Sequence, residues 1–273
     1  MALKSDQPVG LFDSGVGGLT VAGAIKRILP HEDLIYVGDI AHLPYGDKSA
    51  EAVKYYSKKI SEFLLEKNCK IILVACNTAS ALAFEDVKNF VGDKAIVLNV
   101  IDPVIDYLFK KGKNDKVGII GTKGTIGSSV YRDKIKLMAP ELEVVSLATP
   151  LFVPMIEEGF IFDDISNAII RSYLSKPQIE DISTLILGCT HYPIIKSQIN
   201  KYYDFKVDII DSAQTAATQL RAVLESENLL NNNENSIYKY FVSDYTPSFE
   251  VISKMFLEDE IHLEKLDLWK ENI

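Results

Sequence analysis

The sequence predicts an α/β protein of two pseudo-symmetric, doubly wound lobes. Each lobe is expected to be a mainly parallel sheet flanked by helices, with the active site between the lobes. Short apolar segments alternate with helical patterns along most of the 273 residues. The strand pattern at 117–122 repeats that of 9–14 at an offset of 108 residues, and the segment ending at Cys189 repeats the one ending at Cys76 at an offset of 113. Two pairs of similar segments, separated by nearly the same number of residues, indicate an internal duplication.

The expected lobe boundaries follow from the places where this pattern restarts. We expect residues 1–98 with 211–273 to form the first lobe and residues 99–210 to form the second. The chain is long enough for both lobes to bury a core of their own. Its last expected strand, 237–242, therefore returns to the first lobe and precedes a helix expected at 247–257.

Each expected element of the first lobe has a local reason. Residues 9–12 form an apolar strand, a glycine-rich turn follows at 13–18, and a helix begins at Leu19 and ends before Pro30. Further strands are expected at 34–37, 71–75 and 95–100, and a helix from Ser49 to about Lys67.

The second lobe repeats this alternation after residue 117. Strands are expected at 117–122, 143–148, 185–187 and 207–210, and helices at 124–138 and 163–174. A proline-flanked segment at 151–158 lies between two of them. Pro193 suits the first turn of a helix after the Cys189 strand. A helix expected at 212–225 follows the return to the first lobe.

Charge and hydropathy restrict the class of partner. The chain has 29 Lys and Arg against 38 Asp and Glu, a net charge of -9, and no long basic block, which argues against a nucleic-acid surface. No apolar run approaches the length that crosses a bilayer, and residues 1–8 lack the apolar core of a signal peptide. We expect a cytoplasmic protein whose partner is a small molecule.

The cysteines indicate neither disulfides nor a metal site. Three cysteines are an odd number for a disulfide framework, and no Cys or His spacing is typical of zinc ligands. Cys69 has no flanking Thr or His and is expected to be a buried structural residue.

Cys76 and Cys189 each end an apolar strand and precede a helical pattern. Ligands bind at the carboxyl ends of parallel strands, and a helix N-terminus favours the thiolate. Each cysteine taken alone is compatible with a buried structural thiol, and a single reactive thiol would suggest covalent acyl chemistry. A symmetric pair favours another reaction, in which one thiolate removes a proton and the opposite thiol returns one, so that a stereocentre is inverted.

Polar residues near the two cysteines allow more than one interpretation. The turn at 13–18 lacks the Lys-Ser/Thr of a phosphate loop, and its leading Asp13 suits an amino group better than a phosphate, although the glycines could serve only a sharp turn. Asp13 and Glu157 could modulate one thiol each. His191 is either a capped loop histidine or a group that polarises Cys189, and His42 is kept as a further candidate.

Four motifs resemble those of glutamate racemases: Asp13-Ser14-Gly15-Val16-Gly17-Gly18-Leu19-Thr20, Pro44-Tyr45-Gly46, Ala75-Cys76-Asn77-Thr78-Ala79 and Gly188-Cys189-Thr190-His191-Tyr192-Pro193. They occur in the same order over most of the chain, and residues 226–273 contribute least. The resemblance implies cofactor-independent interconversion of L- and D-glutamate, with D-glutamate supplied to peptidoglycan. It also implies a homodimer.

The resemblance also assigns residues, motif by motif. The implied catalytic residues are Cys76, Cys189, Asp13, Glu157 and His191. The implied substrate-binding residues are Asp13, Ser14, Pro44, Tyr45, Gly46, Asn77, Thr78, Thr122, Thr125, Thr190 and His191. The alignment of this motif could shift by one residue, so Glu158 is an alternative to Glu157. An aspartate or hydantoin racemase, a non-catalytic amino-acid-binding protein and a cysteine hydrolase remain alternatives.

Overall fold

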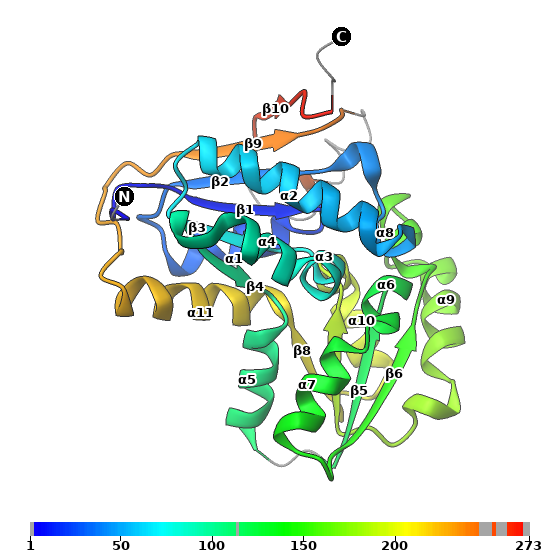
Figure 1. The fold of residues 1–273 in the computed structure, drawn as a ribbon. Helices are drawn as coiled ribbons and strands as arrows, with labels where there is room; N and C mark the ends of the chain where they lie inside the picture. The colour runs from blue at the N-terminus through cyan, green and yellow to red at the C-terminus, as the bar shows by residue number, and fades with distance from the viewer. Residues whose placement is uncertain (1–2, 113–114, 246–252, 255–260, 270–273) are drawn as a thin grey trace.

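A computed structural model describes residues 3–112, 115–245, 253–254 and 261–269 (Figure 1). The chain forms two parallel sheets. The strands of the first are, in spatial order, β10 (Leu263–Lys265), β9 (Tyr238–Val242), β2 (Leu34–Gly38), β1 (Val9–Asp13), β3 (Ile71–Val74) and β4 (Ile96–Asn99). Those of the second are β6 (Glu143–Ala148), β5 (Lys116–Gly121), β7 (Thr184–Gly188) and β8 (Asp208–Asp211). This α/β architecture confirms the predicted fold class.

The two sheets share one strand order. In the first, the sequence β2-β1-β3-β4 places the first strand at the centre, and β6-β5-β7-β8 does the same in the second. Cys76 follows β3 and Cys189 follows β7, so the two cysteines occupy equivalent positions. Strands β9 and β10 extend only the first sheet. The first sheet therefore draws on 9–99 and 238–265 and the second on 116–211, while the lobe boundaries stay a prediction.

Helices cover both faces of each sheet, as Figure 1 shows. The helices that precede β5 in the chain are α1 (Leu19–Ile28), α2 (Ala50–Glu66), α3 (Asn77–Leu82), α4 (Phe84–Val91) and α5 (Asp102–Lys111). Those that follow β5 are α6 (Lys123–Gly127), α7 (Val130–Met138), α8 (Phe152–Glu157), α9 (Asp164–Leu174), α10 (Lys196–Tyr202) and α11 (Ser212–Ser226). Short 3-10 turns lie at Ile40–His42, Tyr45–Asp47, Gly92–Lys94, Pro177–Ile179 and Tyr192–Ile195.

The core explains why the strands are apolar on both faces. In the first sheet, α1 and α11 bury one face and α2 and α4 bury the other. In the second, α8, α9 and α10 cover one face while α5 and α7 cover the other. Every residue of β1, β2, β3 and β7 is buried, which a continuous apolar run in a doubly covered parallel sheet requires. No helix within the described ranges is long and apolar enough to cross a membrane.

Two predictions about secondary structure were incomplete. The helix expected at 124–138 is two helices, α6 and α7, because Ser129 adopts a left-handed conformation (φ 60°) and Ser128 bonds the backbone on both sides of it. Serine side chains compete in this way with the helical pattern. Strand β10 was missed because it is a three-residue edge strand, mostly exposed. The helix expected at 247–257 lies outside the described residues except for 253–254.

Candidate active site

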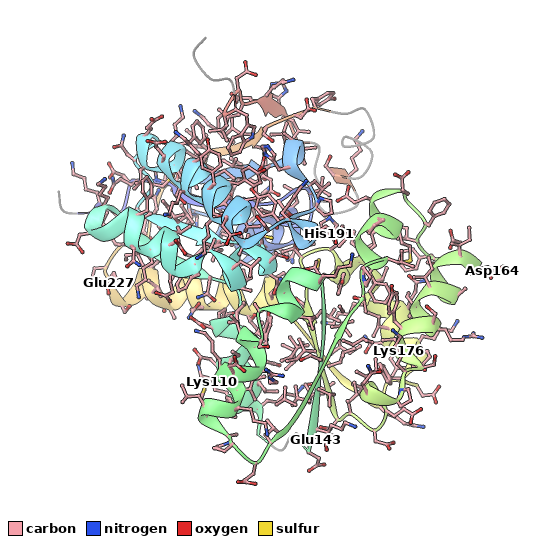
Figure 2. The ribbon with its side chains drawn as sticks, turned by 45° about the vertical axis from the view of Figure 1, so that its right-hand side comes forward. Lys110, Glu143, Asp164, Lys176, His191 and Glu227 are labelled. Carbon is pink, nitrogen blue, oxygen red and sulfur yellow. The ribbon has the colours of Figure 1, made fainter. Side chains whose placement is uncertain are left out.

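The carboxyl ends of the central strands of both sheets meet at one small cavity. It holds about 10 Å³, roughly the space of one water molecule. All predicted site residues line this cavity except Asp13, Glu157 and Thr125, and Val153, which the sequence did not suggest, lines it too. Figure 2 shows His191 where the two lobes meet. Both Cys76 and Cys189 contribute to its wall.

On the Cys189 side, three side chains form a chain of contacts. The Nδ1 atom of His191 lies 3.8 Å from the Cys189 sulfur, and its Nε2 atom lies 2.5 Å from Glu157 Oε1. Burial lowers the pKa of His191, but hydrogen bonds with Cys189 and Glu157 and their charges raise it by more, so its pKa lies well above the usual value. The Cys189 sulfur and the Glu157 carboxylate therefore both favour the protonated form of the imidazole. Glu157 at the end of α8 makes this contact, whereas Glu158 is exposed.

On the Cys76 side, the surroundings are different. Cys76 is the N-cap of α3, and its sulfur accepts from the Ala79 amide at 3.5 Å and lies 3.8 Å from Ser14 Oγ. Burial raises the pKa of Cys76 well above its usual range, and the charge of Asp13 raises it further, while the Ala79 and Ser14 hydrogen bonds oppose this. Burial thus favours the neutral thiol form of Cys76.

Asp13 stands behind the cavity wall and organises the glycine-rich turn. Its Oδ2 atom accepts from the amides of Gly15 at 3.2 Å and Gly18 at 2.9 Å, and its Oδ1 atom accepts from Thr190 Oγ1 at 3.3 Å. These amides are the donors a phosphate would need, so the carboxylate takes the place of an anion. The Thr190 hydrogen bond joins the two lobes.

Hydroxyls and amides form the opposite wall. Thr78 Oγ1 lies 2.9 Å from Thr122 Oγ1 and 3.2 Å from Thr125 Oγ1, and the latter two are 3.1 Å apart. This triangle joins α3 of the first lobe to α6 of the second. Asn77 is held by Ser212 at 3.3 Å and by the Tyr131 hydroxyl at 2.7 Å.

Pro44, Tyr45 and Gly46 line the cavity. The Tyr45 hydroxyl donates to Asp39 Oδ2 at 2.7 Å. Within the described part of the chain, the amides of Tyr45 and Gly46 donate to no backbone carbonyl. His42, kept as a candidate, bonds Asp39 and does not line the cavity. Asp39 was missed because two of its partners, Ser243 and Trp269, come from a distant part of the chain.

Cys69 is remote from this chemistry. It is buried under Gly10 of β1, whose added Cβ would lie 2.8 Å from the Cys69 sulfur. Burial raises the pKa of Cys69 to about 12, so the thiol stays neutral. No three His, Cys, Asp or Glu side chains gather into a metal site within the described residues.

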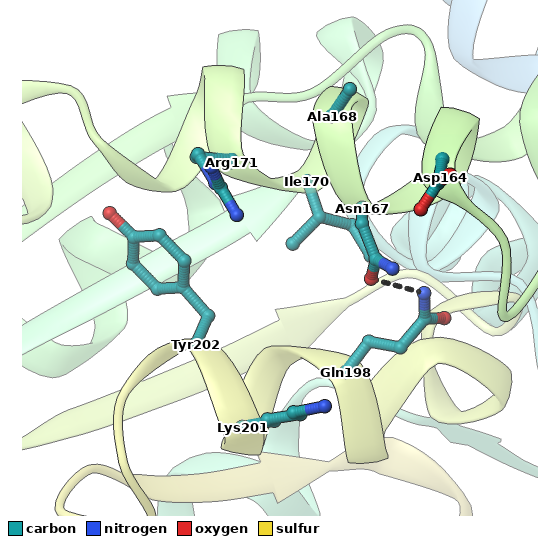
Figure 3. A pocket seen from close by; sticks show the side chains of 8 residues that line it. All are labelled: Asp164, Asn167, Ala168, Ile170, Arg171, Gln198, Lys201 and Tyr202. Carbon is teal, nitrogen blue, oxygen red and sulfur yellow. Dashed lines mark hydrogen bonds between the residues drawn. The ribbon is translucent and has the colours of Figure 1, made fainter.

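A larger hollow of about 630 Å³ lies between α9 and α10 (Figure 3). Its wall includes Arg171, Lys201 and Tyr202, and Gln198 donates to Asn167 Oδ1 at 3.0 Å across it. None of the predicted site residues lines this hollow. The small cavity, with both thiols, is therefore the candidate active site.

Two parallel sheets of the same strand order, each followed by a strand-end cysteine that lines one shared cavity, define the class as a two-lobed α/β protein with a candidate site between its lobes. The chain belongs to the Asp/Glu/hydantoin racemase family, whose model matches residues 19–220. It is 43% identical to a glutamate racemase of Geobacter metallireducens, over 91% of this chain and 92% of that one.

Solved structures agree with this membership. A glutamate racemase of Francisella tularensis in complex with D-glutamate superposes with a TM-score of 0.90 at 40% identity, covering 97% of this chain and 99% of that one. A glutamate racemase isoform of Bacillus anthracis superposes with a TM-score of 0.92 at 36% identity, over 97% of this chain and 98% of that one. The resemblance found in the sequence motifs is thereby confirmed.

Proposed function

We propose that this protein interconverts L- and D-glutamate by proton transfer at the α-carbon, with Cys76 and Cys189 as the two acid/base groups and no cofactor. The observation that carries the proposal is that both thiols line one cavity from equivalent strand ends. One thiolate takes the α-proton, breaking a C–H bond and forming S–H. The other thiol gives its proton to the opposite face of the carbanion, and the configuration is inverted.

The two sulfurs have different neighbours, which favours a defined start. The Nδ1 atom of His191 lies 3.8 Å from the Cys189 sulfur, where a protonated imidazole stabilises negative charge, and Glu157 holds the other side of the ring. Burial raises the pKa of Cys76 and favours its protonated form. On this geometry we assign Cys189 as the base in the first half-reaction and Cys76 as the acid. The reverse direction must begin after the two sulfurs exchange protonation states.

Neutral donors suit a substrate with two carboxylates that must also develop a carbanion. Ser14, Thr78, Thr122 and Thr190 line the cavity with Asn77, and among the residues that the structure describes no Lys or Arg lines it. Such donors stabilise charge at the transition state without fixing the substrate through one dominant ion pair. We assign the substrate amino group to the side of the buried Asp13.

The cavity is too small for glutamate as it stands, so the lobes must separate for entry and close for reaction. Closure excludes water from the carbanion. The cytoplasm is the compartment we propose, because the reaction needs both cysteines as free thiols and a reducing compartment keeps them so.

The test is polarimetric or circular-dichroism detection of D- and L-glutamate interconversion without added cofactor, with aspartate as the competing substrate. Cys76→Ser and Cys189→Ser should each lower racemisation by at least about a thousandfold, to the residual level typical of lost acid/base groups. In deuterated water, residual α-proton exchange should favour opposite enantiomers in the two variants. Cys69→Ala is the matched control and should racemise normally.

Other results point to the alternatives. Faster turnover of aspartate than glutamate would indicate an aspartate racemase. Glutamate binding without turnover, insensitive to thiol alkylation, would indicate a binding protein. An acyl-thioester on one cysteine, with indifference to loss of the other, would indicate a hydrolase.

Two broader expectations belong to the same proposal. Supply of D-glutamate to peptidoglycan predicts that a cell lacking this protein requires external D-glutamate for growth. A homodimer predicts twice the chain mass in sedimentation or light scattering. Each measurement is independent of the thiol mechanism.

A further inference from the structure

Asp39 lies outside the cavity and carries a fully buried carboxylate at the end of β2. Its Oδ2 atom accepts from the Tyr45 hydroxyl at 2.7 Å and lies 2.9 Å from His42 Nδ1. Its Oδ1 atom accepts from Ser243 Oγ at 2.7 Å and from Trp269 Nε1 at 2.9 Å. A buried carboxylate is costly unless donors satisfy it, so these four groups and Asp39 hold one another in place.

This carboxylate joins segments that are far apart in sequence. Tyr45 belongs to the segment that lines the cavity, while Ser243 and Trp269 belong to the C-terminal part after β9. The Asp39 amide donates to the Asp13 carbonyl at 3.0 Å, so the same residue also touches the strand end that carries the turn. The Asp39 side chain thus connects the C-terminal segment to the segment that lines the cavity.

Packed rings fix the outer half of the network. The His42 ring stacks on Tyr56 with centroids 3.9 Å apart, and Trp269 packs edge-on against both rings, at 4.6 Å and 5.3 Å. Trp269 is therefore held by ring contacts as well as by its hydrogen bond. Replacing it by another aromatic residue would keep much of the packing and remove only the donor.

The position of Tyr45 matters because this residue lines the cavity while its hydroxyl bonds Asp39, which lies outside the cavity. Its phenol is buried, and burial, the charge of Asp39 and the hydrogen bond to it raise the pKa of Tyr45, so the hydroxyl remains a donor. Gly46 next to it packs so closely on Thr122 that an added Cβ would lie 2.5 Å from Thr122 Cβ. Small shifts of this segment would change both the amides offered to a substrate and the fit of the two lobes.

We propose that Asp39 and Trp269 are positioning residues for the reaction: through the Tyr45 hydroxyl they hold the Pro44–Gly46 segment in its substrate-binding place. By this inference, the C-terminal segment at 263–269 contributes to the active site. The inference rests on the proposed racemase function, because its kinetic readout is glutamate turnover.

The experiment compares Trp269→Phe with Tyr238→Phe, followed by Asp39→Asn. Trp269→Phe removes the indole donor and keeps a ring. Tyr238→Phe, on β9, removes a hydrogen bond to Pro30 carbonyl at 3.1 Å that does not involve Asp39. We expect Trp269→Phe to raise the KM for glutamate about three- to tenfold with kcat within about twofold, the pattern of lost ground-state positioning. Tyr238→Phe should leave both constants unchanged, and Asp39→Asn should raise KM further.

The split between KM and kcat separates positioning from stability. A purely structural role would lower the active fraction, so apparent kcat would fall at unchanged KM, and that result would overturn the inference. A second readout needs no substrate: Trp269 is the only tryptophan in the chain. Tyr45→Phe should change its emission through Asp39, and Tyr238→Phe should not. Unchanged emission in Tyr45→Phe would contradict the coupling, whereas a wild-type protein inactive on glutamate would overturn the proposed function.

Discussion

The Nδ1 atom of His191 lies 3.8 Å from the sulfur of Cys189, and Cys189 precedes His191 by two residues in the chain. Cys76, at the equivalent strand end, has no histidine within its hydrogen-bond partners and instead meets Ser14 and the Ala79 amide. Two lobes of the same strand order therefore hold their thiols in chemically different surroundings. In the mechanism we propose, the two directions of racemisation would therefore begin from sulfurs whose charges are stabilised by different groups.

Replacing Glu157 by Gln should lower the pKa of His191, because the glutamate hydrogen bond and charge help to raise it. The ordinary pKa of histidine, which applies to the unfolded chain, is about 6.5. A pKa that is higher in the folded state stabilises the fold, fully so below pH 6.5, and this stabilisation is lost as the pH rises from there through the raised pKa. In Glu157→Gln this loss should be complete at a lower pH, and the free energy of unfolding at pH near 6 should fall.

The measurement is proton NMR of the four histidines together with urea unfolding at several pH values. Glu158→Gln is the control, since Glu158 is exposed beside Glu157. An unchanged titration of His191 in Glu157→Gln, or an equal change in Glu158→Gln, would contradict the assignment.

Replacing Asp13 by Asn should lower the pKa of Cys76. Burial is the larger cause of its raised pKa and remains, but the charge of Asp13, the next cause, is removed. In a background without the other two cysteines, alkylation of Cys76 by iodoacetamide near pH 8 should become several times faster, because the thiolate is the reacting form. Asp47→Asn, at an exposed ion pair with Lys123, should leave the rate unchanged. A slower reaction in Asp13→Asn would show that the turn itself had been disturbed.

Local patterns were enough to predict the strand ends and therefore both thiols. An apolar strand must stop where its carboxyl end meets solvent or ligand, so Cys76 and Cys189 are marked by their immediate neighbours in the sequence. The repeat offset then placed them in equivalent positions. The choice between Glu157 and Glu158 was left open because the sequence at a helix end does not show which of two adjacent residues faces the site. The contact with His191 that distinguishes them comes from another part of the chain.

The network around Asp39 shows what local patterns could not predict. Its partners Ser243 and Trp269 follow Asp39 by more than two hundred residues. Neither lies in a segment with strong periodicity, and β10 is only three residues long. Such a site exists only because β9 joins the sheet beside β2, a tertiary pairing without a sequence signature. The break at Ser129 was missed for a smaller reason, a serine side chain competing with helical hydrogen bonds.

Adding a methyl group at Gly17 should obstruct closure of the lobes. Its Cβ would lie 2.4 Å from Thr190 Oγ1 and 2.5 Å from His191 Nδ1, so the strand-end residues of the second lobe would have to move. We expect Gly17→Ala to lower kcat/KM at least about a hundredfold, since a misplacement of about 1 Å at a site of this kind has that effect. The matched control is Gly127→Ala, whose Cβ would meet nothing within 4 Å. Equal activity of both variants would show that contact at Gly17 does not govern the site.

The ion pair between Lys70 and Glu32 is buried at the opposite end of β3 from Cys76, with both side chains at most 1% exposed. Lys70 Nζ lies 2.7 Å from Glu32 Oε2 and donates to the Leu229 and Ser5 carbonyls. The lysine therefore ties the chain near residue 229 to the first sheet. Its removal would leave a buried carboxylate without its counter-ion.

Lys70→Met should accordingly lower the free energy of unfolding by about 3–5 kcal/mol, the usual cost of breaking a buried pair from one side. Arg221→Ala is the control, because the Arg221–Glu225 pair lies on the surface of α11 and should contribute at most about 0.5 kcal/mol. Urea unfolding followed by circular dichroism measures both. Turnover per folded molecule should be unchanged in Lys70→Met, since the pair does not touch the cavity. A cost no greater than that of Arg221→Ala would mean that Glu32 is protonated or hydrated once the lysine is gone.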